Sequence, residues 1–191
     1  MDDPDGYFGE PVAAGYDDPS DRMFQPEAID PAVSLLAELA GSGRALELAI
    51  GTGRIGLPLS RRGVPVHGIE MSRAMVARLR GKPGGEAIGV TIGDMATTRV
   101  DGTFTVAYLV FNTINNLTSQ EAQVACFRNV AAHLAPGGRT SWVTGQAPSG
   151  SSATALTTPP SGTAAITSSS PTGGGSTGRS RSATHGQPSS I

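Results

Sequence analysis

The sequence predicts an α/β domain with a mostly parallel sheet, and three observations support this fold class. Short apolar runs alternate with segments of helical period from about residue 25 to residue 139. A glycine-rich turn at residues 51–56 follows the first apolar run and leads directly into a helical pattern. Glu47, Glu70 and Asp94 each close a successive run, so in parallel strands they converge on the rim where such folds bind ligands.

A helix and a strand are expected before the glycine-rich turn. Asp30 suits a helix cap and Pro31 suits the first helical position, so the helix is predicted to begin there. Its apolar residues have helical spacing, and Gly41 and Gly43 end it. The apolar run that starts at Ala45 is the expected first strand, against which this helix should pack.

The later elements continue the alternation. Ser72 is expected to cap a helix after the second strand, and residues 120–134 have the spacing of an amphipathic helix. The second and third strands should cover residues 64–70 and 87–92. The fourth, residues 104–111, is almost continuously apolar or β-branched, as a central parallel strand should be.

The glycine-rich turn is compatible with two classes of cofactor. Gly51, Gly53 and Gly56 satisfy the GxGxxG pattern of dinucleotide-binding proteins, and Glu70 is near the position of a ribose-binding acid. Glu47 favours a different ligand, because a carboxylate beside the turn repels a pyrophosphate but not a cation. S-adenosylmethionine carries an ammonium and a sulfonium and no phosphate. It is therefore the predicted cofactor, and a dinucleotide-dependent oxidoreductase is the alternative.

The ends of the second and third strands carry side chains suited to a nucleoside. The Glu70 carboxylate can accept both ribose hydroxyls, and Met71 can cover one face of an adenine. Asp94 can accept the exocyclic amine of the same base. Ordinary packing for Met71 and a simple turn for Asp94 are the alternatives.

The fourth strand ends in a polar loop. Asn112, Thr113 and Asn115 are the candidates for orienting a substrate, because the carboxyl end of a central strand faces the ligand crevice. A solvated loop is the alternative. No side chain stands out as a general base, and no cluster has metal-ligand spacing.

The first 24 residues contain many Asp, Gly and Pro residues, with aromatic side chains among them. These aromatics are Tyr7, Phe8, Tyr16 and Phe24. One interpretation is a partly ordered leader, and the other is a lid whose aromatics close over the ligand.

Composition limits the classes of partner. The chain has 191 residues and a net charge of −2, so no basic excess points to a nucleic acid. It has neither a signal peptide nor a segment of membrane-spanning length, and its single cysteine favours a reducing compartment. A cytoplasmic protein acting on a small molecule is the expectation, and the oligomeric state is left open.

Several segments together resemble the class I, Rossmann-like S-adenosylmethionine-dependent methyltransferases of small-molecule type. The segments are LELAIGTGR, GIEMS, IGDM, FNTINNL and HLAPGG. The resemblance implies methyl transfer to a small-molecule acceptor by an S-adenosylmethionine-binding domain at residues 25–139. Ala49 stands where the family has a glycine. The candidate cofactor-binding residues are Glu47, Ala49, Gly51, Thr52, Gly53, Glu70, Met71, Asp94, Met95 and Phe111.

Residues 140–191 depart from the family. They contain no Asp, Glu or Lys and are rich in Ser, Thr, Gly and Pro, which predicts a disordered tail and C-terminal strands that are missing or replaced. A frameshift near codon 140 would explain the abrupt change. In a shifted frame, permitted synonymous codons for residues 179–191 give VALRYAWPAELD, which resembles the family's C-terminal segment. An inactive truncated methyltransferase remnant is a further alternative.

Overall fold

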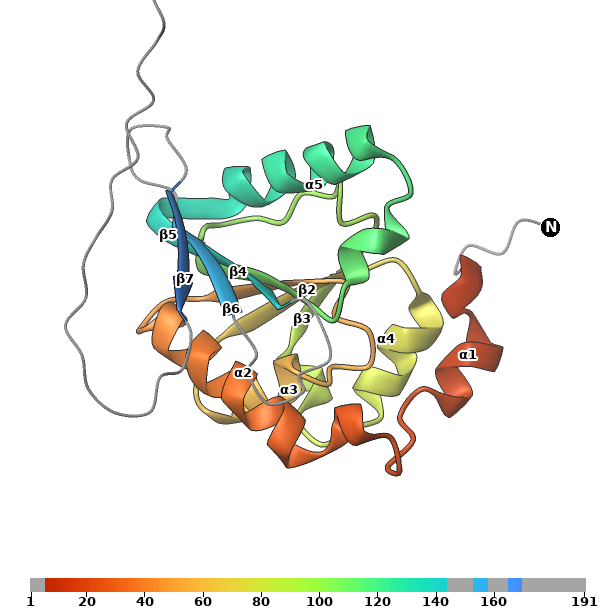
Figure 1. Cartoon of the computed structure of the whole chain (residues 1–191). Coiled ribbons are helices and arrows are strands. Elements are labelled where there is room, and N and C mark those ends of the chain that lie inside the picture. Colours follow the sequence, from red (N-terminus) through yellow and green to blue (C-terminus); the bar gives the residue numbers. More distant parts are fainter. Residues whose placement is uncertain (1–5, 144–152, 158–164, 170–191) are drawn as a thin grey trace, which may run out of the picture.

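Five parallel strands form the centre of the fold, in the order β3-β2-β1-β4-β5 (Figure 1). The computed structural model describes residues 6–143, 153–157 and 165–169. The strands are β1 (Ala45–Leu48), β2 (Val66–Glu70), β3 (Gly89–Ile92), β4 (Phe104–Val110) and β5 (Leu134–Val143). This order confirms the predicted Rossmann-like, mostly parallel sheet.

Two antiparallel strands, β6 (Ala153–Thr157) and β7 (Ala165–Ser169), continue the sheet beyond β5. The predicted disorder of residues 140–191 is therefore wrong for these two segments and for the end of β5. Each segment is uncharged and contains β-branched residues, and the open edge of β5 offers main-chain groups for pairing. The rest of the predicted tail, including the segment used for the frameshift hypothesis, lies outside the described residues.

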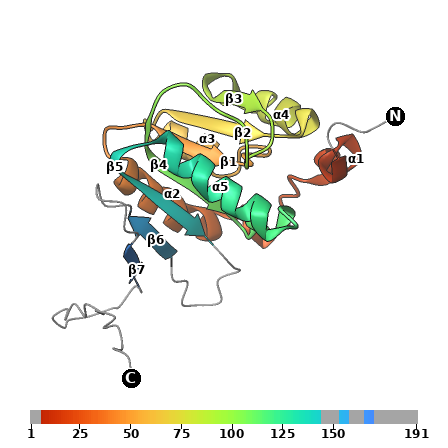
Figure 2. The same ribbon diagram turned by 90° about the horizontal axis from the view of Figure 1, so that it is seen from above.

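The helices form a layer on each face of the sheet (Figures 1 and 2). One layer contains α2 (Pro26–Ala40), α3 (Gly56–Arg61) and α4 (Arg73–Arg80), and the other contains α5 (Gln120–His133). Ser72 caps α4 as predicted, because its side chain accepts a hydrogen bond from the Met75 N–H at 3.0 Å. Three single-turn 3₁₀ helices, η2 (Arg22–Phe24), η3 (Gly85–Ala87) and η4 (Thr113–Asn116), occupy connections.

Alternation along the strands divides the core into two parts. Ala45 and Val106 face α2 and α3, whereas Leu46 and Ala107 face α5. Residues from both layers complete these clusters, among them Leu36 of α2. Because the central strands are buried on both faces, the carboxyl ends of the strands are the natural place for a ligand site.

The helix α2 begins one turn earlier than the sequence predicts. Gln25 occupies the cap position, Pro26 the first helical position, and Pro31 lies inside the helix. Proline is favoured at the first helical position, and the sequence offers two such prolines five residues apart, so the Asp30-Pro31 pair alone could not decide between two starts. A proline this close to the start removes only one helical hydrogen bond, which packing of the apolar face offsets.

The N-terminal region forms a short structured segment beside α4. It consists of η1 (Gly6–Phe8) and α1 (Glu10–Gly15), and α1 packs against α4 at the end of the domain away from β6 and β7 (Figures 1 and 2). The buried Ala13 contacts Ala74 and Met75 of α4. The leader is thus ordered from residue 6 onward.

Candidate functional site

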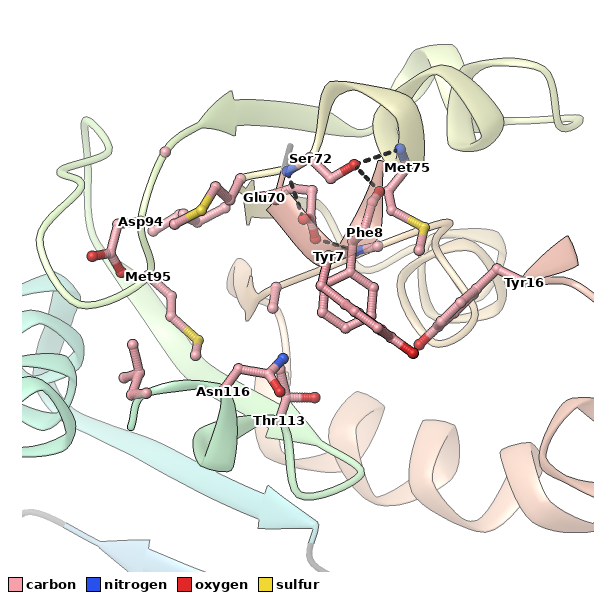
Figure 3. Close-up of a pocket in the computed structure, with 17 residues that line it drawn as sticks. Tyr7, Phe8, Tyr16, Glu70, Ser72, Met75, Asp94, Met95, Thr113 and Asn116 are labelled. Carbon is pink, nitrogen blue, oxygen red and sulfur yellow. Dashed lines mark hydrogen bonds between the residues drawn. The ribbon is translucent and has the colours of Figure 1, made fainter. Parts of the chain in front are cut away.

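A cavity of about 420 Å³ opens at the carboxyl ends of β1 and β2 and beside the loops that follow β3 and β4 (Figure 3). This volume lies in the usual range of small-molecule sites. Several of the residues that the sequence singles out line it, and they come from different strand ends. They are Ala49, Gly51, Glu70, Met71, Asp94, Met95 and Thr113.

Glu70 is the last residue of β2, and its carboxylate is held by two main-chain donors. Oε2 accepts the Gly51 N–H at 2.7 Å, and Oε1 accepts the Ser72 N–H at 2.9 Å. One bond joins β2 to the glycine-rich turn and the other joins it to the start of α4. Because Glu70 is only 7% exposed, these bonds fix the orientation of an acid at the cavity wall.

The loop after β3 forms another wall, on the opposite side of the cavity from Tyr16 (Figure 3). Asp94 starts a tight turn there, since its Oδ1 accepts the Ala96 N–H at 2.8 Å. Met95 beside it is buried, whereas Met71 is 49% exposed at the cavity rim. The cavity therefore presents a second carboxylate flanked by thioether side chains.

The glycine-rich turn brings the main chain itself to the cavity. Ala49 and Gly51 adopt left-handed conformations, with φ of 51° and 57°. A Cβ added to Gly51 would meet no atom within 4 Å, so the main chain there faces open space. Ala49 has a side chain in a conformation that favours glycine, which indicates that tertiary packing imposes the bend.

Glu47 does not line the cavity. It points to the α3 side of the sheet, where its Oε2 accepts a hydrogen bond of 2.9 Å from the hydroxyl of Tyr108, a residue of β4. A Cβ on Gly56 would lie 2.7 Å from this oxygen, so the carboxyl lies directly under the start of α3. Burial raises the pKa of Glu47 to about 8, against the effects of Tyr108 and Arg54.

Phe111 does not line the cavity and instead packs against Arg54. Its ring lies under the guanidinium of Arg54, with 3.6 Å between the guanidinium carbon and the ring centroid, and the Phe24 ring lies 4.8 Å from the same carbon. Phe111 and Asn112 both have φ of 58°, so the chain turns sharply at the end of β4. Asn112 and Asn115 do not line the cavity, and Thr113 is the predicted substrate residue that does.

Two further predicted residues lie beside the cavity without lining it. The Thr52 hydroxyl donates a hydrogen bond of 2.6 Å to Asp17, which follows α1. Gly53 has φ of 83°, and a Cβ there would lie 2.4 Å from Leu79. Both residues are buried, so they hold the turn in place by a hydrogen bond and by close packing.

The cavity also has lining residues that the sequence did not single out as site residues. Ser72, Met75 and Asn116 are examples, and they lie one helical turn or less from predicted positions. Their proximity to Met71 and Thr113 in the sequence was the available signal. For the aromatic residues of the first 24 positions, the sequence left a partly ordered leader and a lid as alternatives. Tyr7, Phe8 and Tyr16 line the cavity, whereas Phe24 does not.

In residues 6–143 and the two outer strands, no three or more His, Cys, Asp or Glu side chains form a group suited to a metal ion. No helix in that same part of the chain has the length and apolarity to cross a membrane. Burial raises the pKa of the Cys126 thiol to about 11, and the Asp94 carboxylate adds to the shift, so this cysteine is a protonated packing residue.

Comparisons with known proteins agree with this geometry. Residues 45–138 match the family described as a methyltransferase domain. The cypemycin N-terminal methyltransferase of a Streptomyces species is 32% identical over 93 residues, which is 49% of this chain and 38% of that protein. The chain spans about two fifths of the length of the curated relatives it matches.

Solved structures of two methyltransferases share the fold. The CcbJ methyltransferase of Streptomyces caelestis superimposes with a TM-score of 0.62 and 25% identity, over 85% of this chain and 79% of that one. The glycopeptide N-methyltransferase MtfA, solved with S-adenosylmethionine, gives a TM-score of 0.55 and 26% identity over 67% and 52% of the two chains. The domain at residues 45–138 therefore belongs to the class I, Rossmann-like methyltransferases, a family that depends on S-adenosylmethionine.

Proposed function

We propose that the chain binds S-adenosylmethionine in the 420 Å³ cavity and transfers its methyl group to an amine nitrogen of a small molecule. The observation that carries the proposal is the Glu70 carboxylate, held at the end of β2 by two main-chain donors and facing a main-chain turn with open space at Gly51. The oriented carboxylate can accept hydrogen bonds from ribose hydroxyls, and its negative charge favours a ligand without a phosphate.

The residues at the strand ends fit the parts of the cofactor. Each oxygen of a carboxylate can accept more than one hydrogen bond, so a Glu70 oriented by main-chain donors can also receive ribose hydroxyls. Asp94 provides an acceptor for the amine of adenine, and Met71 and Met95 provide apolar cover for its ring. The main chain at Ala49 and Gly51 would lie beside the methionine portion.

The charge of the cavity favours a cationic donor and an acceptor that is not anionic. Among the residues that the structure describes, Glu70 and Asp94 are its two acidic side chains and no basic side chain lines it. A sulfonium and an ammonium are stabilised beside carboxylates, whereas a phosphate or carboxylate group is not. The same field lets the amine acceptor approach as a cation before it loses a proton to water.

Two observations support nitrogen as the acceptor atom, namely the neutral polar side chains of the described lining and the names of similar proteins. When bound, S-adenosylmethionine supplies an electrophilic methyl group: the nitrogen lone pair forms the new C–N bond, the C–S bond breaks, and its electron pair stays on sulfur. The side chains at the loop after β4 that face the cavity are neutral, namely Thr113 and Asn116, and they can orient an amine by hydrogen bonds. Two of the similar proteins are named for methylation at nitrogen or at an N-terminus.

The proposal is tested by incubating the chain with methyl-labelled S-adenosylmethionine and paired acceptors. The pairs are an amino sugar with its N-acetyl derivative, and a short peptide with its N-acetylated form. We expect label only in the member with a free amine. Equal labelling of both members would contradict the nitrogen assignment, and labelling of neither would contradict methyl transfer by this chain.

A further inference from the structure

Residues 6–17 form a strap that covers one side of the cavity. Gly6, Tyr7, Phe8 and Tyr16 of this strap line the cavity. The three aromatic side chains lie across it from Asp94 (Figure 3). Tyr7 is 80% exposed, so it lies at the outer surface of the strap. A ligand enclosed by these side chains cannot leave along this side unless the strap moves.

The strap contacts the rest of the domain through one small apolar cluster, in which its Phe8, Val12 and Tyr16 side chains are only partly buried. Ala13 is its one fully buried apolar residue within the described part, and it contacts Ala74 and Met75. A six-residue helix with so small an apolar face is not stable by itself. Its position therefore depends on polar contacts with the domain in addition to this cluster.

These polar contacts occur at three places. The Ser72 hydroxyl donates a hydrogen bond of 2.6 Å to the carbonyl of Phe8. Arg78 of α4 pairs with Glu10 at the start of α1. The third place is Asp17 at the end of the strap, whose carboxylate contacts two residues of the domain, Thr52 and Lys82.

Asp17, Thr52 and Lys82 form a closed triangle of hydrogen bonds. Lys82 Nζ lies 2.7 Å from Asp17 Oδ2 and donates to the Thr52 carbonyl at 2.7 Å, while the Thr52 hydroxyl donates to Asp17 Oδ1 at 2.6 Å. The triangle joins the strap both to the glycine-rich turn and to the residues that follow α4. The Lys82 and Asp17 side chains are 27% and 30% exposed, compared with 41% and 67% for Arg78 and Glu10.

We propose that Asp17, Thr52 and Lys82 form a latch that holds the strap closed over the cavity and sets how long the cofactor stays bound. The inference rests on the proposed function, because it takes the ligand to be S-adenosylmethionine or its product S-adenosylhomocysteine. Asp17 and Lys82 do not line the cavity, so they act as positioning residues through Tyr16 and the glycine-rich turn. Partial burial strengthens a charged hydrogen bond relative to an exposed pair. The Asp17–Lys82 pair therefore stabilises the closed strap more than the Arg78–Glu10 pair does.

The latch is tested by the rate at which S-adenosylhomocysteine dissociates, measured by stopped-flow competition. We expect Asp17→Ala to increase this rate by roughly 10-fold, since it removes a partly buried charged partner. Glu10→Ala is the matched control: it truncates an acid of the same strap whose ion pair is exposed, and we expect less than about a twofold change. Lys82→Met should resemble Asp17→Ala, and Lys82→Arg should restore most of the slow dissociation.

A merely structural role for Asp17 gives a different result. It would lower the melting temperature of Asp17→Ala and leave the dissociation rate unchanged, and that result overturns the proposal. Hydrogen exchange of residues 6–17 without ligand separates the latch from the proposed function. If wild type fails to bind S-adenosylhomocysteine, the proposed function fails, while faster exchange in Asp17→Ala than in Glu10→Ala still supports the latch and equal exchange overturns it.

Discussion

The hydroxyl of Tyr108 donates a hydrogen bond of 2.9 Å to the carboxyl of Glu47, and both side chains are almost completely buried behind the glycine-rich turn. The two residues are 61 positions apart and belong to the neighbouring strands β4 and β1. Burial raises the pKa of Glu47 to about 8 and raises that of Tyr108 well above its ordinary value. Glu47 is thus a buried acid that holds its proton at neutral pH and supports the turn from below.

The raised pKa of Glu47 predicts a pH dependence of stability. A carboxyl with a raised pKa binds its proton more tightly in the folded state, so its contribution is complete below 4.5 and is lost as pH rises towards about 8. Between these values we expect this group to lower the free energy of unfolding by about 1.4 kcal/mol per pH unit. Urea unfolding at several pH values should show this slope in wild type, and Glu47→Gln should remove it. An identical slope in both proteins would contradict the assignment.

Loss of the Tyr108 hydroxyl should expose the cost of removing one hydrogen-bond partner from a buried acid. Tyr108→Phe keeps the ring and removes the donor, and we expect a loss of about 1–3 kcal/mol in the free energy of unfolding. At a pH above 8, where the Glu47 carboxyl is ionised, the same change should cost less in the Glu47→Gln background, because the amide stays neutral. Equal costs in the two backgrounds would show that the residues are not coupled.

Gly53 is expected to be intolerant of any side chain. Its φ of 83° is unfavourable for other residues, and a Cβ would lie 2.4 Å from Leu79. Gly63 provides the matched control, since it has φ of 86° and open space around the same position. We expect Gly53→Ala to lower stability by about 2 kcal/mol more than Gly63→Ala does. Similar losses in thermal unfolding would mean that Leu79 moves aside without cost.

Ala49 should be improved by the glycine that the family uses. With φ of 51°, alanine is strained there, and Ala49→Gly relieves this at some cost in unfolded-chain entropy. We expect a net gain of up to about 1 kcal/mol in urea unfolding. Ala131→Gly, at an exposed position inside α5, should instead lose about 1 kcal/mol. Destabilisation by both changes would show that the main chain at Ala49 is relaxed.

The sequence was sufficient for the alternating strands and helices between residues 25 and 139 and for the rim of the site, because both depend on local patterns. The alternation of apolar runs with segments of helical period located the strands. The acids at the ends of β2 and β3, Glu70 and Asp94, line one cavity. Glu47 differs because it shares the phase of Ala45 and so faces α3 instead of the cavity. Its partner Tyr108 is distant in the sequence, and no local pattern joins the two.

The strap was not predictable for the same reason. Its helix is short, and its position depends on single contacts such as Ser72 with Phe8 and Asp17 with Lys82. Such pairs have no periodic signal in one sequence. The outer strands β6 and β7 were also missed, because a composition typical of disorder does not exclude pairing with an available sheet edge.

The central claim is that the cavity binds S-adenosylmethionine through Glu70, and calorimetric titration with S-adenosylhomocysteine tests it most directly. We expect wild type to bind one equivalent, and Glu70→Ala to weaken binding by about 30-fold or more, or about 2 kcal/mol, through loss of charged hydrogen bonds. Asp94→Ala should weaken it as well, whereas Glu86→Ala in η3, away from the cavity lining, should bind as wild type does. Thermal unfolding of each variant confirms that it is folded. Absence of binding to wild type, unchanged affinity in folded Glu70→Ala, or preferential binding of a nicotinamide dinucleotide would contradict the account.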